Sequence, residues 1–385
     1  MNDLVQLYEL PLWTSAISVI GTVGLMLGGP VGATLMDHLG SRPTFGIETC
    51  TMAITILILY FTLRLPQEKD KRPPHAAGRL EYPSAALLLL SVATPLFAIN
   101  LGGEMFPWHH PLVITLLCLT PAFVTLFYYV DTRVAATPIV PKRFLRNKHV
   151  AVALACTLPM KFVFDQLRFS FGTYLEARTF HSENSFSDWA LTCIYLGRPL
   201  GTIGSGILVR RYRKYKRFLQ LNIIADIVLY ACFAWGKIQP EKPAFAPLLV
   251  FIGATEGSSE GLWLVALLSL VEPEDQPLLY AFYDLALCIA GDLGIAISLA
   301  TESSLVRSRL HTKLSGYNNA AEVIRKSLED LTYVQQLPPR LQTIILDVLI
   351  SSTEVAFGIS CAVLAISLVA SLYVKEMSRS PSIMS

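Results

Sequence analysis

Apolar residues fill long, nearly uncharged windows that recur from one end of the chain to the other. Each window is about 20 residues long, enough for a helix rising about 1.5 Å per residue to cross about 30 Å of hydrocarbon. None alternates polar and apolar residues as a strand of a transmembrane barrel would. The pattern predicts an all-α polytopic membrane protein with about ten transmembrane helices. The predicted spans are 12–36, 45–64, 82–103, 111–130, 149–165, 186–209, 218–236, 245–271, 278–301 and 342–374.

Basic residues are concentrated in loops on one side of the predicted bundle. If the spans alternate in direction, loops 64–81, 131–148 and 210–217 share one side and together contain sixteen Lys and Arg residues. Cytoplasmic loops carry an excess of these residues, so both chain termini are predicted to lie in the cytoplasm. The alternation also supports the fifth span, although Lys161 and Asp165 interrupt its apolar sequence.

One sizeable polar stretch separates the last two spans. Within it, the segment 320–331 has apolar residues at helical spacing, which predicts an amphipathic surface helix packed on the bundle; a binding role is the alternative. The spans and loops predict three parts of the chain. Residues 1–65 form two helices, residues 66–148 form two linking helices with flanking cytoplasmic loops, and residues 149–385 form a six-helix bundle with a long extra-cytoplasmic loop at 302–341.

Composition agrees with a membrane location and argues against several functions. Hydrophobic residues make up 53% of the chain, charged residues 16%, and the mean hydropathy is +0.49, which soluble domains do not show. The net charge of +2 gives no reason to expect a nucleic-acid partner. The seven cysteines occur singly, without CxxC pairs or nearby histidines, so no metal or other cofactor is predicted. No HExxH motif occurs, and the pattern GxSxG occurs only at 257–261, inside a predicted span instead of at a strand-to-helix turn, so no catalytic residue is assigned and no enzyme is predicted.

The first span contains a glycine repeat. Gly24, Gly28 and Gly32 recur every four residues and would leave one helix face without side chains, so that a neighbouring helix can approach closely. Pro30 within this strip removes a backbone hydrogen bond and would bend the helix. Glycines four residues apart are by themselves compatible with ordinary tight packing. The longer pattern to which they belong comprises Gly28, Gly29, Pro30, Gly32, Asp37, Gly40 and Arg42.

This longer pattern resembles the antiporter motif of the major facilitator superfamily, which its members carry in their fifth helix. The resemblance is to the fourteen-helix drug:proton antiporter branch, and within it to fungal vacuolar basic amino acid transporters and azole-resistance proteins. Shorter matches follow in the family's order along nearly the entire chain. They include 78–82, 101–103, 138–141, 204–206, 214–215, 264–267, 275–276 and 337–339.

The resemblance implies which helices of the family the chain contains and what the protein does. A fourteen-helix member entered at its fifth helix has ten helices left, so about four N-terminal helices would be absent and residues 1–65 would be the remnant of an N-terminal bundle. The resemblance implies a proton-coupled transporter of basic amino acids or amphipathic drugs in the vacuolar or plasma membrane. Its partners would be the lipid bilayer, a small-molecule substrate and protons, with no protein partner indicated. The alternative is a truncated, transport-inactive membrane protein or an incomplete gene model, because alternating access rocks two halves against each other.

Acidic residues inside the predicted spans are candidates for function, because a charged group at membrane depth costs about 2.5–3.5 kcal/mol on insertion scales. Glu256 and Glu260 lie one helical turn apart, where two carboxylates can share a proton. Asp284 and Asp292, eight residues apart, also lie roughly on one face. We assign these four residues to a substrate or proton relay, with Arg198 and Lys161 as candidate counter-ions. The alternative is that such charges pair and serve packing alone. Neither glutamate matches the family pattern, so neither is an inherited site.

Overall fold

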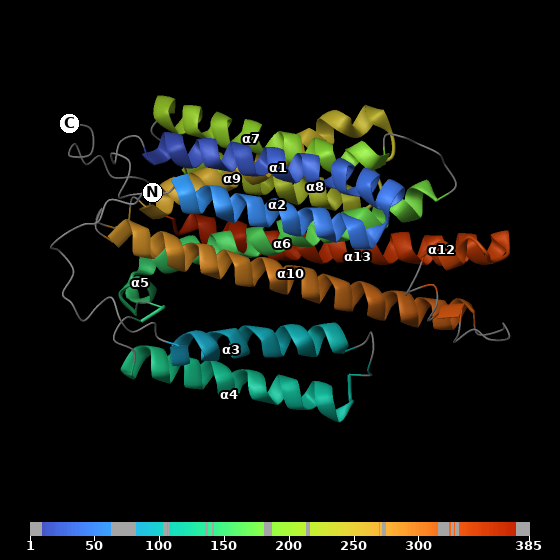
Figure 1. Cartoon of the computed structure of the whole chain (residues 1–385), viewed down its shortest axis with the longest axis horizontal. Coiled ribbons are helices and arrows are strands. Elements are labelled where there is room, and N and C mark those ends of the chain that lie inside the picture. Colours follow the sequence, from blue (N-terminus) through green and yellow to red (C-terminus); the bar gives the residue numbers. More distant parts are fainter. Residues whose placement is uncertain are drawn as a thin grey trace.

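The part of the chain that the computed structural model describes is almost entirely α-helical. It comprises residues 10–62, 82–102, 106, 108–134, 138–140, 142–180, 187–212, 216–268, 270–271, 275–314, 323–324, 327 and 331–374. Ten helices of 19 residues or more in these ranges coincide with the ten predicted spans (Figure 1). They are α1 (Leu10–Leu39), α2 (Ser41–Thr62), α3 (Tyr82–Leu101), α4 (Pro111–Arg133), α6 (Lys148–Thr179), α7 (Ser187–Tyr212), α8 (Lys216–Ala234), α9 (Ala246–Leu268), α10 (Gln276–Lys313) and α13 (Pro339–Leu372).

Seven of these helices are long and apolar enough to cross a bilayer, counted over the described residues. They are α2, α3, α4, α6, α8, α10 from Leu278 onward, and α13. The prediction of an all-α polytopic membrane protein is therefore confirmed.

The helices pack side by side along one common direction (Figure 1). In the main bundle, α6 contacts α10 and α13, α13 contacts α8, and α7 lies along α9. On one side of it, α1 packs against α7 and α2 packs against α1. Helices α3 and α4 form a hairpin that lies beyond α10, and α3 contacts α10 (Figure 1). Three helices of the bundle, α6, α7 and α9, carry the charged residues described below.

Aromatic rings form the centre of the main bundle. Tyr174 on α6 meets Phe357 on α13 with ring centroids 5.7 Å apart, and Phe233 on α8 lies 5.2 Å from Phe357. All three side chains are at most 1% exposed. Aromatic side chains bury large areas, so this contact fixes α8 and α13 against α6.

Apolar side chains also cover the outside of the molecule, most clearly on α2 and α4. Tyr60 and Ile56 on α2 are 82% and 68% exposed, and Tyr129 on α4 is 61% exposed. In water such surfaces mark association sites, but in a bilayer the lipid chains are as apolar as these side chains. We therefore interpret both surfaces as lipid-facing.

The start of α1 and the end of α13 lie at the same end of the bundle (Figure 1). The short helix α5 (Lys142–Arg146), in one of the predicted cytoplasmic loops, lies at this end too. Ten antiparallel long helices, an even number, give this arrangement. Assigning this end to the cytoplasm remains a prediction from the basic loops.

Two helices continue well past their predicted ends. Helix α6 runs to Thr179 instead of ending at 165, and α10 runs to Lys313 instead of ending at 301. The sequence predicts both ends too early, at polar residues. The helices continue through these residues because several of them are paired inside the bundle.

The extended part of α10 helps to form a second, smaller core. Its Val306 and Leu310 pack with Val334 of α12 (Leu331–Val334) and with Ile345 and Val348 of α13. The polar stretch predicted as a loop over 302–341 is thus partly helical. Most of its amphipathic segment lies outside the described residues, but positions 323–324 are helical and pack on this core.

Candidate functional site

Helices α7 and α9 touch through glycines. Gly197 and Gly201 on α7 face α9, and Gly253 and Gly257 on α9 face α7. A Cβ atom at any of the four would fall on a backbone carbonyl oxygen of the opposite helix. Both pairs have the four-residue spacing that allows close helix approach in membranes. Because Arg198 directly follows the first of these glycines, the contact places the start of its side chain at α9.

The glycine strip of the antiporter-like motif lies differently. A Cβ at Gly24, Gly28 or Gly32 on α1 would meet no atom within 4 Å in the part of the chain that is described. The close partner expected for this strip is therefore not among the described helices.

The end of the motif forms a sharp break between α1 and α2. Gly40 has φ +82°, a left-handed conformation that side chains other than glycine rarely adopt, and its N–H donates to the carbonyl of Met36. Arg42 begins α2 and is exposed. The side-chain surroundings of positions Gly29, Pro30 and Asp37 lie outside the described residues.

Six charged side chains meet where α6, α7 and α9 come together. This charge cluster consists of Lys161, Asp165 and Arg168 on α6, Arg198 on α7, and Glu256 and Glu260 on α9. Three positive and three negative groups give it no net formal charge. Because paired charges cost much less to bury than isolated ones, this balance explains how the bundle tolerates them.

Arg168 connects α6 to α9. Its Nη2 lies 2.6 Å from Asp165 Oδ1 and 2.6 Å from Glu256 Oε1, and Lys161 Nζ lies 3.0 Å from Asp165 Oδ2. The Glu256 side chain is 7% exposed, against 17% for Arg168. Of the three carboxylates in the cluster, those of Asp165, Glu256 and Glu260, the Glu256 carboxylate is the least exposed.

Arg198 connects α7 to the same carboxylates. Its Nη2 donates to Glu260 Oε2 at 2.5 Å, and its Nε lies 4.0 Å from Glu256 Oε1. Glu260 is 49% exposed and forms the accessible end of the cluster. Each of the two glutamates therefore faces an arginine. The sharing of one proton between Glu256 and Glu260, expected from the sequence, remains a prediction.

The two predicted aspartates of α10 lie beside this cluster without joining it. Asp284 and Asp292 are exposed, and neither forms an ion pair within the ranges given above. The residue before Asp292, Gly291, packs so closely on α6 that a Cβ there would fall on the carboxylate of Asp165. Asp292 therefore directly follows the residue through which α10 contacts the cluster.

A further carboxylate, that of Asp226 on α8, lies near Glu256 of the cluster. Asp226 on α8 is 0% exposed, and neither of its oxygens has a hydrogen-bond partner in the described part of the chain. The hydroxyl of Thr255, the residue before Glu256, donates to the carbonyl of Ile252 at 2.8 Å. No ion pair within the described ranges includes Asp226.

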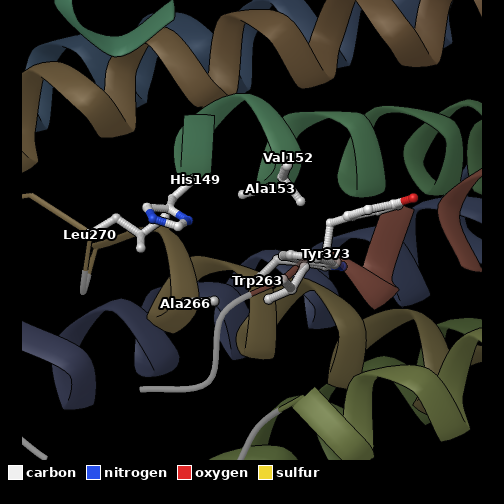
Figure 2. A pocket seen from close by; sticks show the side chains of 8 residues that line it. His149, Val152, Ala153, Trp263, Ala266, Leu270 and Tyr373 are labelled. Carbon is white, nitrogen blue, oxygen red and sulfur yellow. The ribbon is translucent and has the colours of Figure 1, made fainter. Parts of the chain in front are cut away.

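Two cavities lie away from the charge cluster. A pocket of about 10 Å³ lies between the start of α6 and the ends of α9 and α13, lined by His149, Trp263 and Tyr373 among others (Figure 2). This volume is that of about one water molecule. A more open groove of about 380 Å³ lies between Trp108 and α10 and has an almost wholly apolar lining. Neither cavity has a charged lining residue.

Sequence reasoning misses Asp165 and Arg168 as site residues. Their signal is the unusual charge density of the fifth span, but this density predicts the end of the span and not a site. The glycines of α7 and α9 are also missed, although they have the same four-residue repeat as those of α1. Which glycine strip meets a partner is decided by helix packing.

Comparison with known proteins agrees with this architecture. A sequence profile of the Major Facilitator Superfamily matches residues 1–295. Multidrug resistance protein fnx1 of Schizosaccharomyces pombe is 22% identical over 95% of this chain, and the vacuolar membrane amino acid uptake transporter fnx2 of the same organism is 26% identical over 98%. Citrate exporter 1 of Yarrowia lipolytica is 21% identical over 98%.

The chain spans 68%, 65% and 55% of these three proteins, in the same order. The profile covers well over half of the chain, and the helices agree with the resemblance seen in the sequence. The chain belongs to the major facilitator superfamily, whose members are transporters rather than enzymes.

Proposed function

We propose that this protein is a proton-coupled transporter of basic amino acids or amphipathic drugs, and that the charge cluster takes part in the coupling. The observation that carries the proposal is Glu256, 7% exposed, placed between arginines of two other helices. The relatives named for multidrug resistance and for amino acid uptake support both substrate classes. The vacuolar membrane named for one relative supports a vacuolar location, with the plasma membrane as the alternative.

Protonation of Glu256 would change the contacts between three helices. A neutral Glu256 loses its attraction for Arg168 and Arg198, and a buried ion pair that loses one charge is strongly destabilised. The two arginines would then favour a different arrangement of α6, α7 and α9. Alternating access needs such a change, because transporters of this kind move helices around a site near the middle of the membrane.

The exposed acids offer a place for a cationic substrate. Glu260 is half exposed, and Asp284 and Asp292 are exposed without an ion pair in the described ranges. An ammonium or guanidinium group of the substrate would compete with Arg198 for Glu260. A substrate carboxylate, as in a basic amino acid, would in turn suit the guanidinium that Glu260 releases.

The test is uptake of radiolabelled arginine and lysine into liposomes containing the purified protein, with and without a pH gradient. Glu256→Gln is expected to reduce gradient-driven uptake by about tenfold or more, because removing one charge of a buried pair costs about 3–5 kcal/mol. Glu176→Gln on the exposed side of α6 is the matched control and keeps the uptake.

Two results would contradict the proposal. Equal gradient-driven uptake by Glu256→Gln and the unchanged protein would remove the cluster from coupling. A folded, reconstituted protein that moves no basic amino acid and no cationic drug would favour the alternative, a transport-inactive membrane protein. Size-exclusion elution of each variant establishes that a loss of uptake is not a loss of folding.

A further inference from the structure

A second polar group lies between α6, α10 and α13, apart from the charge cluster. Glu302 on α10 accepts hydrogen bonds from Ser170 Oγ on α6 at 2.6 Å and from Ser298 Oγ, one turn earlier on α10, at 2.8 Å. The hydroxyl of Thr353 on α13 is a third neighbour of this carboxylate. The two serine oxygens are 3.1 Å apart. Three helices thus direct oxygen atoms at one point.

These hydroxyls belong to the interior of the bundle. Ser170, Ser298 and Thr353 are 1%, 4% and 3% exposed. Buried hydroxyls that converge on a carboxylate form an oxygen-only ligand set, which hard cations prefer over softer ones. Their burial distinguishes the group from a chance cluster on a surface.

None of the ion pairs found among the described residues includes Glu302. On α6, Arg168 pairs with Glu256. Arg178 donates to the Tyr174 hydroxyl and forms ion pairs with Glu241 and Glu354. On α10, Arg309 donates to Ser351. Helix α3, which also packs on α10, contains no charged residue.

The remaining acids of these helices are also separate from Glu302. On α13, Glu354 belongs to the group around Arg178, and Asp347 is exposed. Asp284 and Asp292 on α10 lie ten residues or more before Glu302 in the sequence. Glu302 itself is half-buried, and its hydrogen bonds from the serines supply no positive charge, so a bound cation would lower the cost of enclosing its carboxylate.

We propose that Glu302, Ser170, Ser298 and Thr353 form a binding site for a small monovalent cation, either a proton or a sodium ion. Either ion supplies the one positive charge that the described surroundings of Glu302 lack. A sodium ion bound there ties α10 to α6 and α13 through a common set of oxygen ligands, and a proton bound there neutralises Glu302 and gives it one hydrogen bond to donate. The site is separate from the charge cluster, in which every carboxylate already has a cationic partner.

The test measures cation binding by the whole purified protein in lipid nanodiscs and does not depend on transport. Thermal unfolding is followed along two series, one of falling pH in sodium-free choline chloride and one of rising sodium chloride at constant pH and ionic strength. A cation that binds only the folded protein raises the unfolding midpoint as its concentration rises. Glu302→Gln, which keeps the shape without the charge, is expected to lose that rise, and Glu176→Gln is expected to keep it.

The two series distinguish the two ions. A rise with falling pH that Glu302→Gln loses identifies a proton site, and a rise with sodium that this variant loses identifies a sodium site. Equal midpoint changes in Glu302→Gln and the unchanged protein, in both series, overturn the proposal. Should Glu302→Gln fail to fold, Ser298→Ala serves instead: a weakened rise supports the site, and an unchanged rise overturns it.

Discussion

At the residue scale, the two most enclosed aspartates in the described ranges have opposite surroundings. Asp131 at the end of α4 is 1% exposed and accepts hydrogen bonds from Ser84 Oγ, from the Ile139 N–H and from the Val140 N–H. Asp226 is equally buried, yet neither oxygen has such a partner. The same residue type therefore makes different contributions to stability at the two positions.

These surroundings predict opposite effects of the same substitution. Asp131→Asn is expected to lower the thermal unfolding midpoint, because the amide nitrogen cannot accept the Val140 hydrogen bond and an unsatisfied buried group costs about 1–3 kcal/mol. Asp226→Asn is expected to leave the midpoint unchanged or higher at pH 8, because a neutral amide avoids burying an ionised carboxylate. Differential scanning fluorimetry in nanodiscs measures both. An equal fall for the two variants would contradict this reading of Asp226.

At the element scale, the glycines decide which helices meet. The contact between α7 and α9 requires glycine at four positions, since any Cβ there would fall on a carbonyl oxygen. In the contact between α6 and α10, a Cβ at Gly294 would fall on the carbonyl oxygen of Phe162, and one at Gly291 would fall on the side-chain carboxylate of Asp165. The α7–α9 contact brings Arg198 to Glu256, so the charge cluster depends on it, and the α6–α10 contact brings α10 up to Asp165.

Substituting one of these glycines is expected to separate the helices. Gly257→Ala places a methyl group on the carbonyl oxygen of Arg198, and overpacking of this kind costs about 1–3 kcal/mol. The unfolding midpoint should fall, and uptake should fall with it because Arg198 moves away from Glu260. Gly204→Ala on α7, where a Cβ meets no described atom within 4 Å, is the matched control and should keep the midpoint. A harmless Gly257→Ala would refute the close packing.

At the scale of the whole molecule, the chain forms a continuous set of antiparallel helices whose first and last members share one end (Figure 1). The core of aromatic residues lies in the bundle of α6, α8 and α13, while α2 and α4 present apolar surfaces outward. The predicted division into 1–65, 66–148 and 149–385 is not tested by these contacts and stays a prediction.

The arrangement of the ends predicts the accessibility of tags. Peptide tags fused at residue 1 and residue 385 are expected to be cleaved by protease from the same side of sealed vesicles, because ten spans return the chain to its starting side. The basic loops place that side in the cytoplasm. Protection of one tag and cleavage of the other would contradict the ten-span topology.

Much of the fold follows from the sequence. Long apolar windows give the ten helices, because a helix satisfies all of its backbone hydrogen bonds within itself and can lie in lipid without a partner. Helix ends are less certain wherever polar residues occur. Asp165 marks a false end although Lys161 and Arg168 pair with it on the same helix, and Glu302 marks another because Ser170 donates to it from α6, 132 residues away.

The sequence by itself determined the class of protein, the number of long helices and the glutamates of α9 as candidates, because hydropathy and the cost of charge in a membrane are local properties. The tertiary structure alone decided that Glu256 faces Arg168, eighty-eight residues away, that Glu260 faces Arg198, and that Ser170 and Thr353 meet Glu302. These contacts depend on which helix faces come together. That choice results from close packing at a few glycines, which the sequence contains but does not assign to partners.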